Sequence, residues 1–123
     1  MIKIFVDGEP IPAARPRYSG GRVYQPARNR EYREKVSWCA KVAMKSAAPL
    51  AGALSAVVKL YRRYRPTSQS FGDVDNHLKA IFDALQGIVF TNDAQIVSCH
   101  VEKHTDGENP RAEIEIAPAA VSV

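Results

Sequence analysis

The sequence predicts an α/β fold of the α+β type, with a mixed sheet of about five strands and two main helices. Several segments alternate apolar and polar residues, as half-buried strands do, and two longer segments repeat apolar residues at helical spacing. A length of 123 residues suits one domain with a real core. We therefore assign residues 1–123 to a single compact domain.

Four segments are predicted to be strands of the main sheet. Residues 2–7 alternate, and residues 54–64 are rich in β-branched and aromatic side chains, which favours an interior position. Residues 94–104 and 111–117 also alternate and flank a strong turn at 105–110. We expect these last two strands to pair with each other as an antiparallel hairpin.

Two segments are predicted to be helices. The longer covers residues 27–46 and carries an apolar stripe with charged residues on its other faces. The clearer helix covers residues 75–86, with Asp75 as a suitable N-cap and Gly87 as a natural residue just past the end. Its apolar stripe has the i, i+3, i+4, i+7 spacing of a helix packed on a core, and consists of Leu78, Ile81, Phe82 and Leu85.

Residues 13–26 contain prolines, glycines and arginines, and Ser19-Gly20-Gly21 suits a tight turn between two short strands. Two interpretations are equally supported. The segment is either a basic flap whose tyrosines stack on bases or sugars, or an edge hairpin whose arginines keep it soluble.

The basic residues are unevenly distributed. The chain has 17 Lys and Arg against 13 Asp and Glu, for a net charge of +4. Most of the basic residues lie in the first half, and Arg62, Arg63 and Arg65 form a second cluster that is either a phosphate contact or a solvated strand end. This distribution favours a polyanionic partner, with nucleic acid first.

Other sequence features narrow the protein class. No run reaches the ~18 apolar residues of a membrane span, and the N-terminus does not resemble a signal peptide, so the cytoplasm is the expected location. The two cysteines, Cys39 and Cys99, are expected to be reduced and buried. His77 lies one turn from an acidic pair, whereas His100 and His104 are too far apart along a strand to bind one metal ion.

The acidic pair, Asp73 and Asp75, is part of the most informative stretch, residues 71–93. Lys79 follows one helical turn later, and Asp93 comes after a short apolar segment. Carboxylate oxygens are the ligands that Mg²⁺ prefers, and a divalent ion with a nearby lysine suits phosphodiester hydrolysis. The alternative is structural, because Asp75, Lys79 and Asp83 have the spacing of a salt-bridged helix face and acids are common at caps and turns.

The same stretch resembles the RusA family of Holliday-junction resolvases, which are phage-associated endodeoxyribonucleases. The family motif is roughly D-x-D-N-x-x-K-x-x-x-D-A-L, then a short apolar stretch, then D-D-x-Q-[VI]. Here residues 73–85 are DVDNHLKAIFDAL and residues 92–96 are NDAQI. The order of the predicted elements and Lys103 near the end of the penultimate strand also agree with the family.

The resemblance implies a RusA-like homodimer that resolves four-way DNA junctions by paired symmetric nicks in recombination and repair. It implies Mg²⁺, with Mn²⁺ as an alternative ion, bound by Asp73, Asp75 and Asp93, and a catalytic role for Lys79. Asn92 stands where the family often has a further Asp. No nucleotide cofactor or membrane is implied. The DNA contacts that we expect are Arg15, Arg17, Arg62, Arg63 and Lys103. A non-catalytic protein that binds DNA or junctions is the alternative function.

Overall fold

The computed structural model describes residues 1–14, 17–24 and 26–120, and leaves the side chains of 17–19 and 22–24 undescribed. Its main sheet has four strands in the order β1-β6-β4-β5, and a two-stranded hairpin lies apart from it. The α+β prediction is therefore confirmed. The strands are β1 (Ile2–Asp7), β2 (Arg17–Ser19), β3 (Arg22–Tyr24), β4 (Leu54–Arg62), β5 (Ile96–Thr105) and β6 (Arg111–Pro118); the helices are α1 (Ala27–Met44), α2 (Val74–Leu85) and a short 3₁₀ helix, η1 (Asp93–Gln95).

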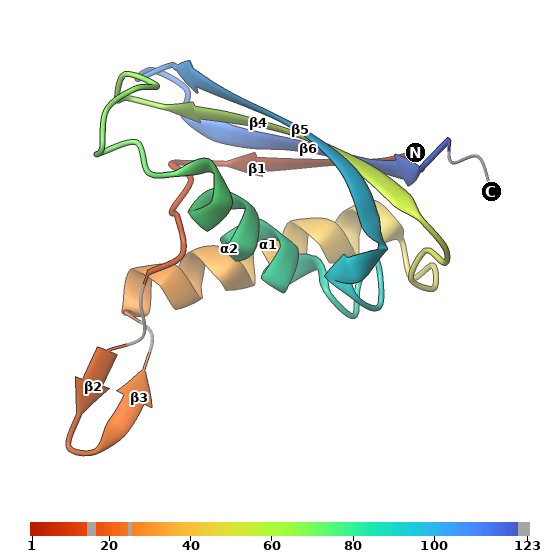
Figure 1. Ribbon diagram of the computed structural model, residues 1–123, viewed down its shortest axis with the longest axis horizontal. Coiled ribbons are helices and arrows are strands. Elements are labelled where there is room, and N and C mark those ends of the chain that lie inside the picture. Colours follow the sequence, from red (N-terminus) through yellow and green to blue (C-terminus); the bar gives the residue numbers. More distant parts are fainter. Residues whose placement is uncertain (15–16, 25, 121–123) are drawn as a thin grey trace.

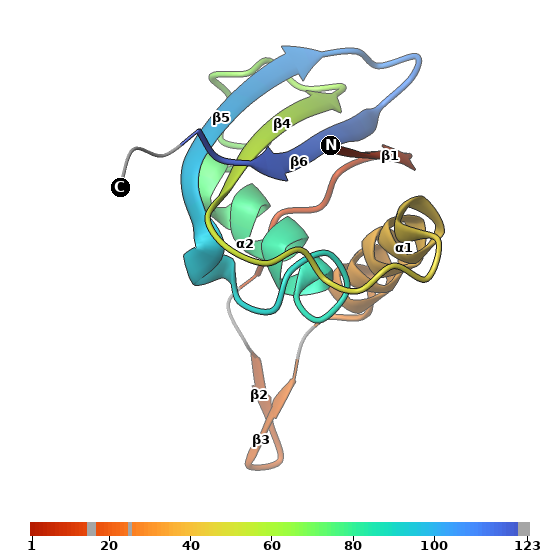
Figure 2. The same ribbon diagram turned by 90° about the vertical axis from the view of Figure 1, so that its right-hand side faces the viewer.

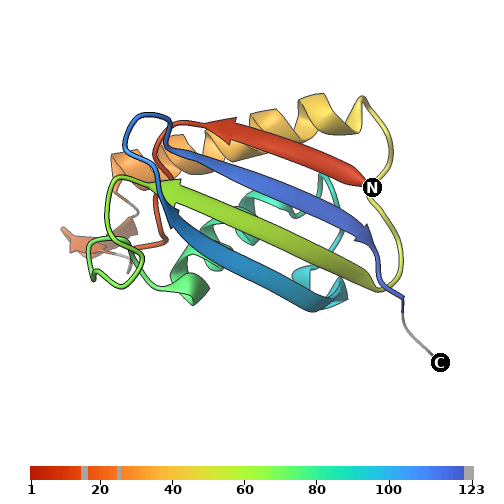
Figure 3. The same ribbon diagram turned by 90° about the horizontal axis from the view of Figure 1, so that it is seen from above.

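The prediction that the last two strands pair with each other is wrong. β4 lies between them, pairing antiparallel with β6 and parallel with β5. β6 pairs on its other side with β1. β4 alternates between buried and half-buried residues and has no exposed position, as suits a strand in the interior of the sheet. β5 and β1 become the edge strands of the described sheet (Figure 3).

Both helices cover the same face of the sheet, and the other face is open (Figures 1 and 2). α1 packs against α2 and β1. The core is formed where the inward face of the sheet meets the apolar stripes of the helices, with Val36, Val58, Leu85 and Ile116 fully buried. A core of this kind is stabilised by removal of apolar surface from water.

The hairpin β2–β3 extends away from the body of the molecule (Figures 1 and 2). Gly20 and Gly21 both have positive φ, the backbone of a tight two-residue hairpin turn, as the sequence indicated. The hairpin is not an edge of the main sheet. None of the helices in the described part of the chain is long and apolar enough to cross a membrane.

Candidate functional site

The acidic pair lies at the start of α2. Asp73 is the N-cap residue and Asp75 belongs to the first turn, so the prediction that Asp75 caps the helix is wrong by two residues. Both residues are exposed. Neither carboxylate has a hydrogen bond or ion pair with any described residue. Two free carboxylates at the N-terminal end of a helix are available to a cation from solution.

A buried network fixes this end of α2. Phe71 is fully buried, and its carbonyl oxygen accepts hydrogen bonds from Arg62 Nη1 at 2.6 Å and from the ring of His77 at 2.7 Å. Gly72 has a φ of +95°, and a Cβ there would lie 2.9 Å from His77 Nε2 and from Pro12 Cγ. Only glycine fits between these groups. The network therefore sets where the chain enters the helix and where Asp73 lies.

Arg62 belongs to this network, and its expected role in DNA contact is a wrong prediction. The residue is only 3% exposed, and its Nε donates to Glu9 Oε1 at 3.0 Å. Its guanidinium also lies over the rings of Tyr64 and Phe71. Because Arg62 is the last residue of β4 on the inward face of the sheet, it joins the strand to the start of α2 and cannot reach a DNA backbone.

His77 is a neutral structural residue. It is 1% exposed, and burial lowers the pKa of its ring from 6.5 to about 4, an effect that the hydrogen bond to Phe71 opposes only in part. Because a carbonyl oxygen can only accept, the neutral ring carries its proton on Nε2. His77 therefore supports the start of α2 from within the core, through the carbonyl oxygen of Phe71.

Lys79 lies one turn further along α2 and pairs with Asp83 at 3.3 Å rather than with Asp75. Its side chain is two-thirds exposed. Of the two ion pairs that the spacing of Asp75, Lys79 and Asp83 allows, only the one between Lys79 and Asp83 is therefore formed. Asp83 holds the lysine along the helix, and the acidic pair keeps its charge.

Asp93 lies at the opposite end of α2. Its backbone N–H donates to Oε1 of Gln86, the C-cap residue of α2, at 3.1 Å. The 12-residue helix is about 18 Å long, so one protomer holds its first two aspartates and its third at opposite ends. No group of three metal-ligating side chains exists within the described part of a single chain. The expectation that Asp93 returns to the acidic pair is therefore wrong for one protomer.

Asn92 has a structural role that explains where Asp93 lies. Its side chain accepts a hydrogen bond from the backbone N–H of Ala94 at 2.8 Å, and Gln95 Oε1 accepts one from the backbone N–H of Asn92 at 3.1 Å. This reciprocal capping box starts the 3₁₀ helix η1. Gln95 also donates to the carbonyl oxygens of Leu50 and Gly52. The turn is thereby fixed against the loop that precedes β4.

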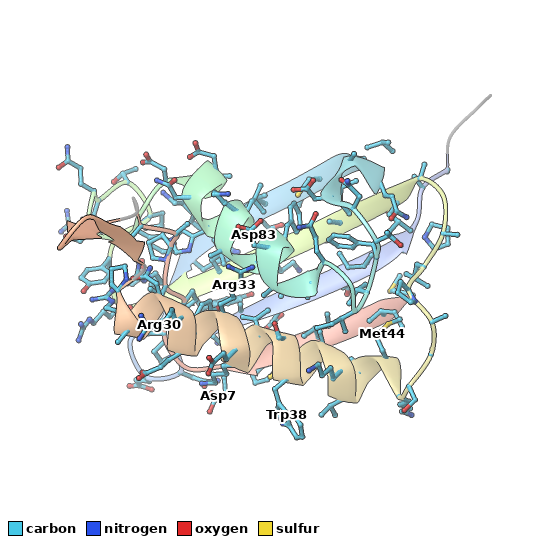
Figure 4. The ribbon with its side chains drawn as sticks, turned by 90° about the horizontal axis from the view of Figure 1, so that it is seen from below. Asp7, Arg30, Arg33, Trp38, Met44 and Asp83 are labelled. Carbon is cyan, nitrogen blue, oxygen red and sulfur yellow. The ribbon has the colours of Figure 1, made fainter. Side chains whose placement is uncertain are left out.

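A basic groove between the helices adjoins Lys79. Its lining includes Arg30 and Arg33 of α1 together with Lys79 and Asp83 of α2. A second hollow shares both arginines and continues past Trp38 to Lys41. Figure 4 shows Arg33 between the helices below Asp83, and Trp38 pointing away from α1.

Sequence reasoning assigned these α1 charges to a solvated helix face. The signal in the sequence is Trp38, which lies among these cations and beside rather than within the apolar stripe of the helix. The structure leaves Trp38 68% exposed, although tryptophan is highly buried on average.

The other expected DNA contacts are distributed as follows. Arg63 is exposed and stacks on Tyr64. Lys103 donates to the carbonyl oxygen of Pro66 at 3.0 Å and lies over the ring of Phe71, next to the start of α2. Arg15 lies outside the described residues, and the side chain of Arg17 is likewise not described.

The cysteines and the remaining histidines lie away from this site. Both cysteines are free, as predicted, but Cys99 is exposed because β5 is an edge strand, so the prediction of a buried thiol is wrong there. His100 and His104 bind opposite oxygens of Glu102 at 2.8 and 2.7 Å. Both imidazoles therefore contact one carboxylate, and no group of three side chains that could hold a metal ion is found among the described residues.

Comparison with known proteins identifies the family to which this chain belongs. The model of the RusA endodeoxyribonuclease family matches residues 7–117, which include both helices and the whole acidic stretch. The chain is also similar to the uncharacterized protein YqaN of Bacillus subtilis, with 31% identity over 94% of each chain. The chain therefore belongs to the RusA family of endodeoxyribonucleases.

Proposed function

We propose that this protein is a Mg²⁺-dependent, structure-selective endonuclease that resolves four-way DNA junctions by paired symmetric nicks. Membership of the family supports nuclease activity on branched DNA. The observation that carries the proposal further is that the three acids of the family motif, Asp73, Asp75 and Asp93, are exposed and have no side-chain partner among the described residues. Unpaired carboxylate oxygens are available as ligands for a hard divalent cation.

The residues present fit a hard divalent ion. Asp73, Asp75 and Asp93 offer only oxygen ligands, and Mg²⁺ commonly takes a few carboxylates and keeps several waters. When bound, the ion supplies positive charge at the scissile phosphate. Mn²⁺ is the alternative ion for the same ligands. The Asn92 side chain accepts the capping hydrogen bond from Ala94, so Asn92 would not be a metal ligand.

We propose that each metal site is shared between two copies of the chain. Asp73 and Asp75 of one protomer would form a site with Asp93 of the other, because α2 separates the three within a protomer. The proposal requires a homodimer, and a two-fold dimer then has two equivalent sites. Two equivalent sites match a substrate with two equivalent strands to cut.

The chain's own cations would bind and orient the DNA. Lys79 lies one turn from the acidic pair, where an ammonium group can contact the scissile phosphate or hold the attacking water. The groove with Arg30 and Arg33 continues away from Lys79, and it would hold the phosphates of a duplex arm. Arg63 and Lys103 are on the β4–β5 side of the same end.

The experiment is incubation of the purified protein with an end-labelled four-way junction, in Mg²⁺ and in EDTA. We expect paired nicks at symmetric positions in Mg²⁺ and none in EDTA. A linear duplex of the same sequence is the substrate control. Asp75→Asn should abolish nicking but keep junction binding in a gel shift. Asp7→Asn, which removes an acid far from the site, is the matched control and should nick normally.

Two results would contradict the proposal. Junction binding without nicking in Mg²⁺ or Mn²⁺ would favour the non-catalytic alternative. Equal nicking of junction and linear duplex would retain the nuclease but remove the structure selectivity.

A further inference from the structure

We infer that the dimer forms by antiparallel pairing of the edge strand β5 with β5 of a second copy, about a two-fold axis close to Cys99 and His100. The inference rests on the proposed function, since it names the surface that would bring Asp93 to the partner's acidic pair. The exposed edge strand on which the inference is based does not depend on the proposed metal site. Among the described strands, β5 is ten residues long, lies at the sheet edge, and is exposed over residues 97–100.

The two halves of the proposed metal site lie at the two ends of this edge. Asp93 is three residues before β5 begins and is fixed there through η1. The other end of β5 lies beside the entrance to α2, because Lys103 contacts Pro66 and Phe71, and Thr105 donates to the carbonyl oxygen of Tyr64. The acidic pair follows two residues after Phe71. Figure 3 shows the start of α2 on the β5 side of the sheet.

Antiparallel pairing exchanges these two ends. When two β5 strands pair antiparallel, the start of one lies beside the end of the other. Asp93 of one protomer is then brought to the end at which the other protomer enters α2. The reverse contact forms at the same time on the other side of the axis. No other described edge achieves this, because β1, at the opposite edge, is separated from Asp93 by the width of the sheet.

The direction of the axis follows from the pleat of the strand. A two-fold axis perpendicular to the sheet keeps the helices of both copies on one face, so both sites face one substrate. Such an axis leaves each residue on the same face of the sheet in both copies. Because side chains alternate between faces along a strand, two residues that lie opposite each other must both have even numbers or both have odd numbers. The middle of the edge meets this condition with either Cys99 or His100 opposite its own copy.

The edge also has the right local chemistry. Residues 97–100 contain no acidic or basic residue other than a histidine, and Val97 is 57% exposed. Val97 is the extra residue of a bulge against β4, and the ladder is regular from Ser98 to Thr105. Bulges are common at sheet edges, where they limit uncontrolled pairing.

The first test is cross-linking with a short bis-maleimide, which joins thiols that face each other across an interface. The protein provides its own probe, because its two cysteines lie in different elements, Cys39 in α1 and Cys99 in β5. We expect Cys39→Ser to give a covalent dimer on a denaturing gel and Cys99→Ser to give none. A dimer that cross-links equally well without Cys99, or a native dimer that does not cross-link through it, would overturn the inference.

The second test uses charge at the two edges. Val97→Arg places a cation on the β5 edge near the axis. Phe5→Arg is the matched control on β1, because Phe5 is 55% exposed and Val97 is 57% exposed. By sedimentation, Val97→Arg should weaken dimerisation at least about tenfold, because it would place an unpaired cation within the paired edge. Phe5→Arg should leave it unchanged. The opposite pattern would place the dimer at β1.

These tests fail separately from the proposed function. If Cys99 cross-links but the catalytic sites do not require two copies, the β5 surface is correct and the shared metal site is wrong. If the sites require two copies but Cys99 does not cross-link, the shared site is correct and the dimer uses another surface.

Discussion

The backbone N–H of Asp93 donates a hydrogen bond to Oε1 of Gln86 at 3.1 Å, and this contact fixes the third aspartate at the far end of α2 from the first two. A helix is a rigid spacer, so the separation cannot be closed by side-chain movement. A site that uses all three aspartates must then be assembled from two chains. Under the proposed function, dimerisation would therefore be needed to complete each metal site.

Replacement of Asp73 or Asp75 by Asn should separate activity from stability. Both side chains are exposed and without partners among the described residues, so the free energy of unfolding should fall by less than about 1 kcal/mol, the usual value of an acid at a helix N-terminus. Nicking should be lost, and Mg²⁺ titration by calorimetry should show weaker binding. A loss of stability of several kcal/mol would instead assign these acids to the fold.

His77 should make the fold sensitive to acid. Its pKa of about 4 in the folded state lies below the 6.5 of the unfolded state, so the unfolded chain binds the proton more readily. The stabilisation is fully present above pH ~6.5 and is lost as the pH falls towards 4, by about 3 kcal/mol from this shift.

Urea unfolding between these pH values measures this acid sensitivity. His77→Gln retains a donor for the Phe71 carbonyl oxygen but does not titrate, so it should lose this part of the pH dependence. An unchanged slope in that variant would show that another group is responsible.

Arg62→Met should destabilise the protein by about 3 kcal/mol, because it leaves the carbonyl oxygen of Phe71 without one donor and Glu9 without its cation in a largely buried position. Thermal or denaturant unfolding measures the change. Arg63→Met removes an exposed arginine from the next position, and should change stability by less than about 0.5 kcal/mol. Equal effects of the two substitutions would contradict the buried role of Arg62.

Asn92→Ala removes the side chain that caps η1, and should cost about 1 kcal/mol of stability. Asn92→Asp keeps an oxygen in the same place and should be nearly neutral. Nicking should fall in Asn92→Ala and persist in Asn92→Asp, because the cap positions Asp93. A nicking rate that rises sharply in Asn92→Asp would indicate that a carboxylate there is a further ligand.

The sequence predicted the positions of the strands and helices better than it predicted which strands pair. Alternation in 2–7 and 111–117 and the apolar stripe of α2 gave the correct secondary structure, because each pattern is local. The pairing of β5 with β4 depends on which strand needs two neighbours, and a turn at 105–110 gives no information about that. The nearby turn suggested a hairpin that the sheet does not form.

The site shows the same limit. Residue type and spacing, together with the family resemblance, predicted Asp73, Asp75, Lys79 and Asp93 as site residues. They did not predict the separation of Asp93, which depends on how tightly the chain returns after Gly87. Arg62 has the charge of a DNA contact, and only its burial shows that it is structural. The sequence did not distinguish Arg30 and Arg33 from the other charges of α1, and only the structure shows that they line a groove with Lys79.

The central claim, that each site takes Asp73 and Asp75 from one chain and Asp93 from another, is tested most directly by mixing two inactive variants. Asp75→Asn and Asp93→Asn are each purified, then mixed, unfolded and refolded together so that mixed dimers form. A mixed dimer has one site with both substitutions and one site with none. We predict that each variant alone is inactive and that the mixture nicks one strand of a labelled four-way junction. If all three ligands came from the same chain, every site in the mixture would carry a substitution, and the absence of nicking would contradict the account.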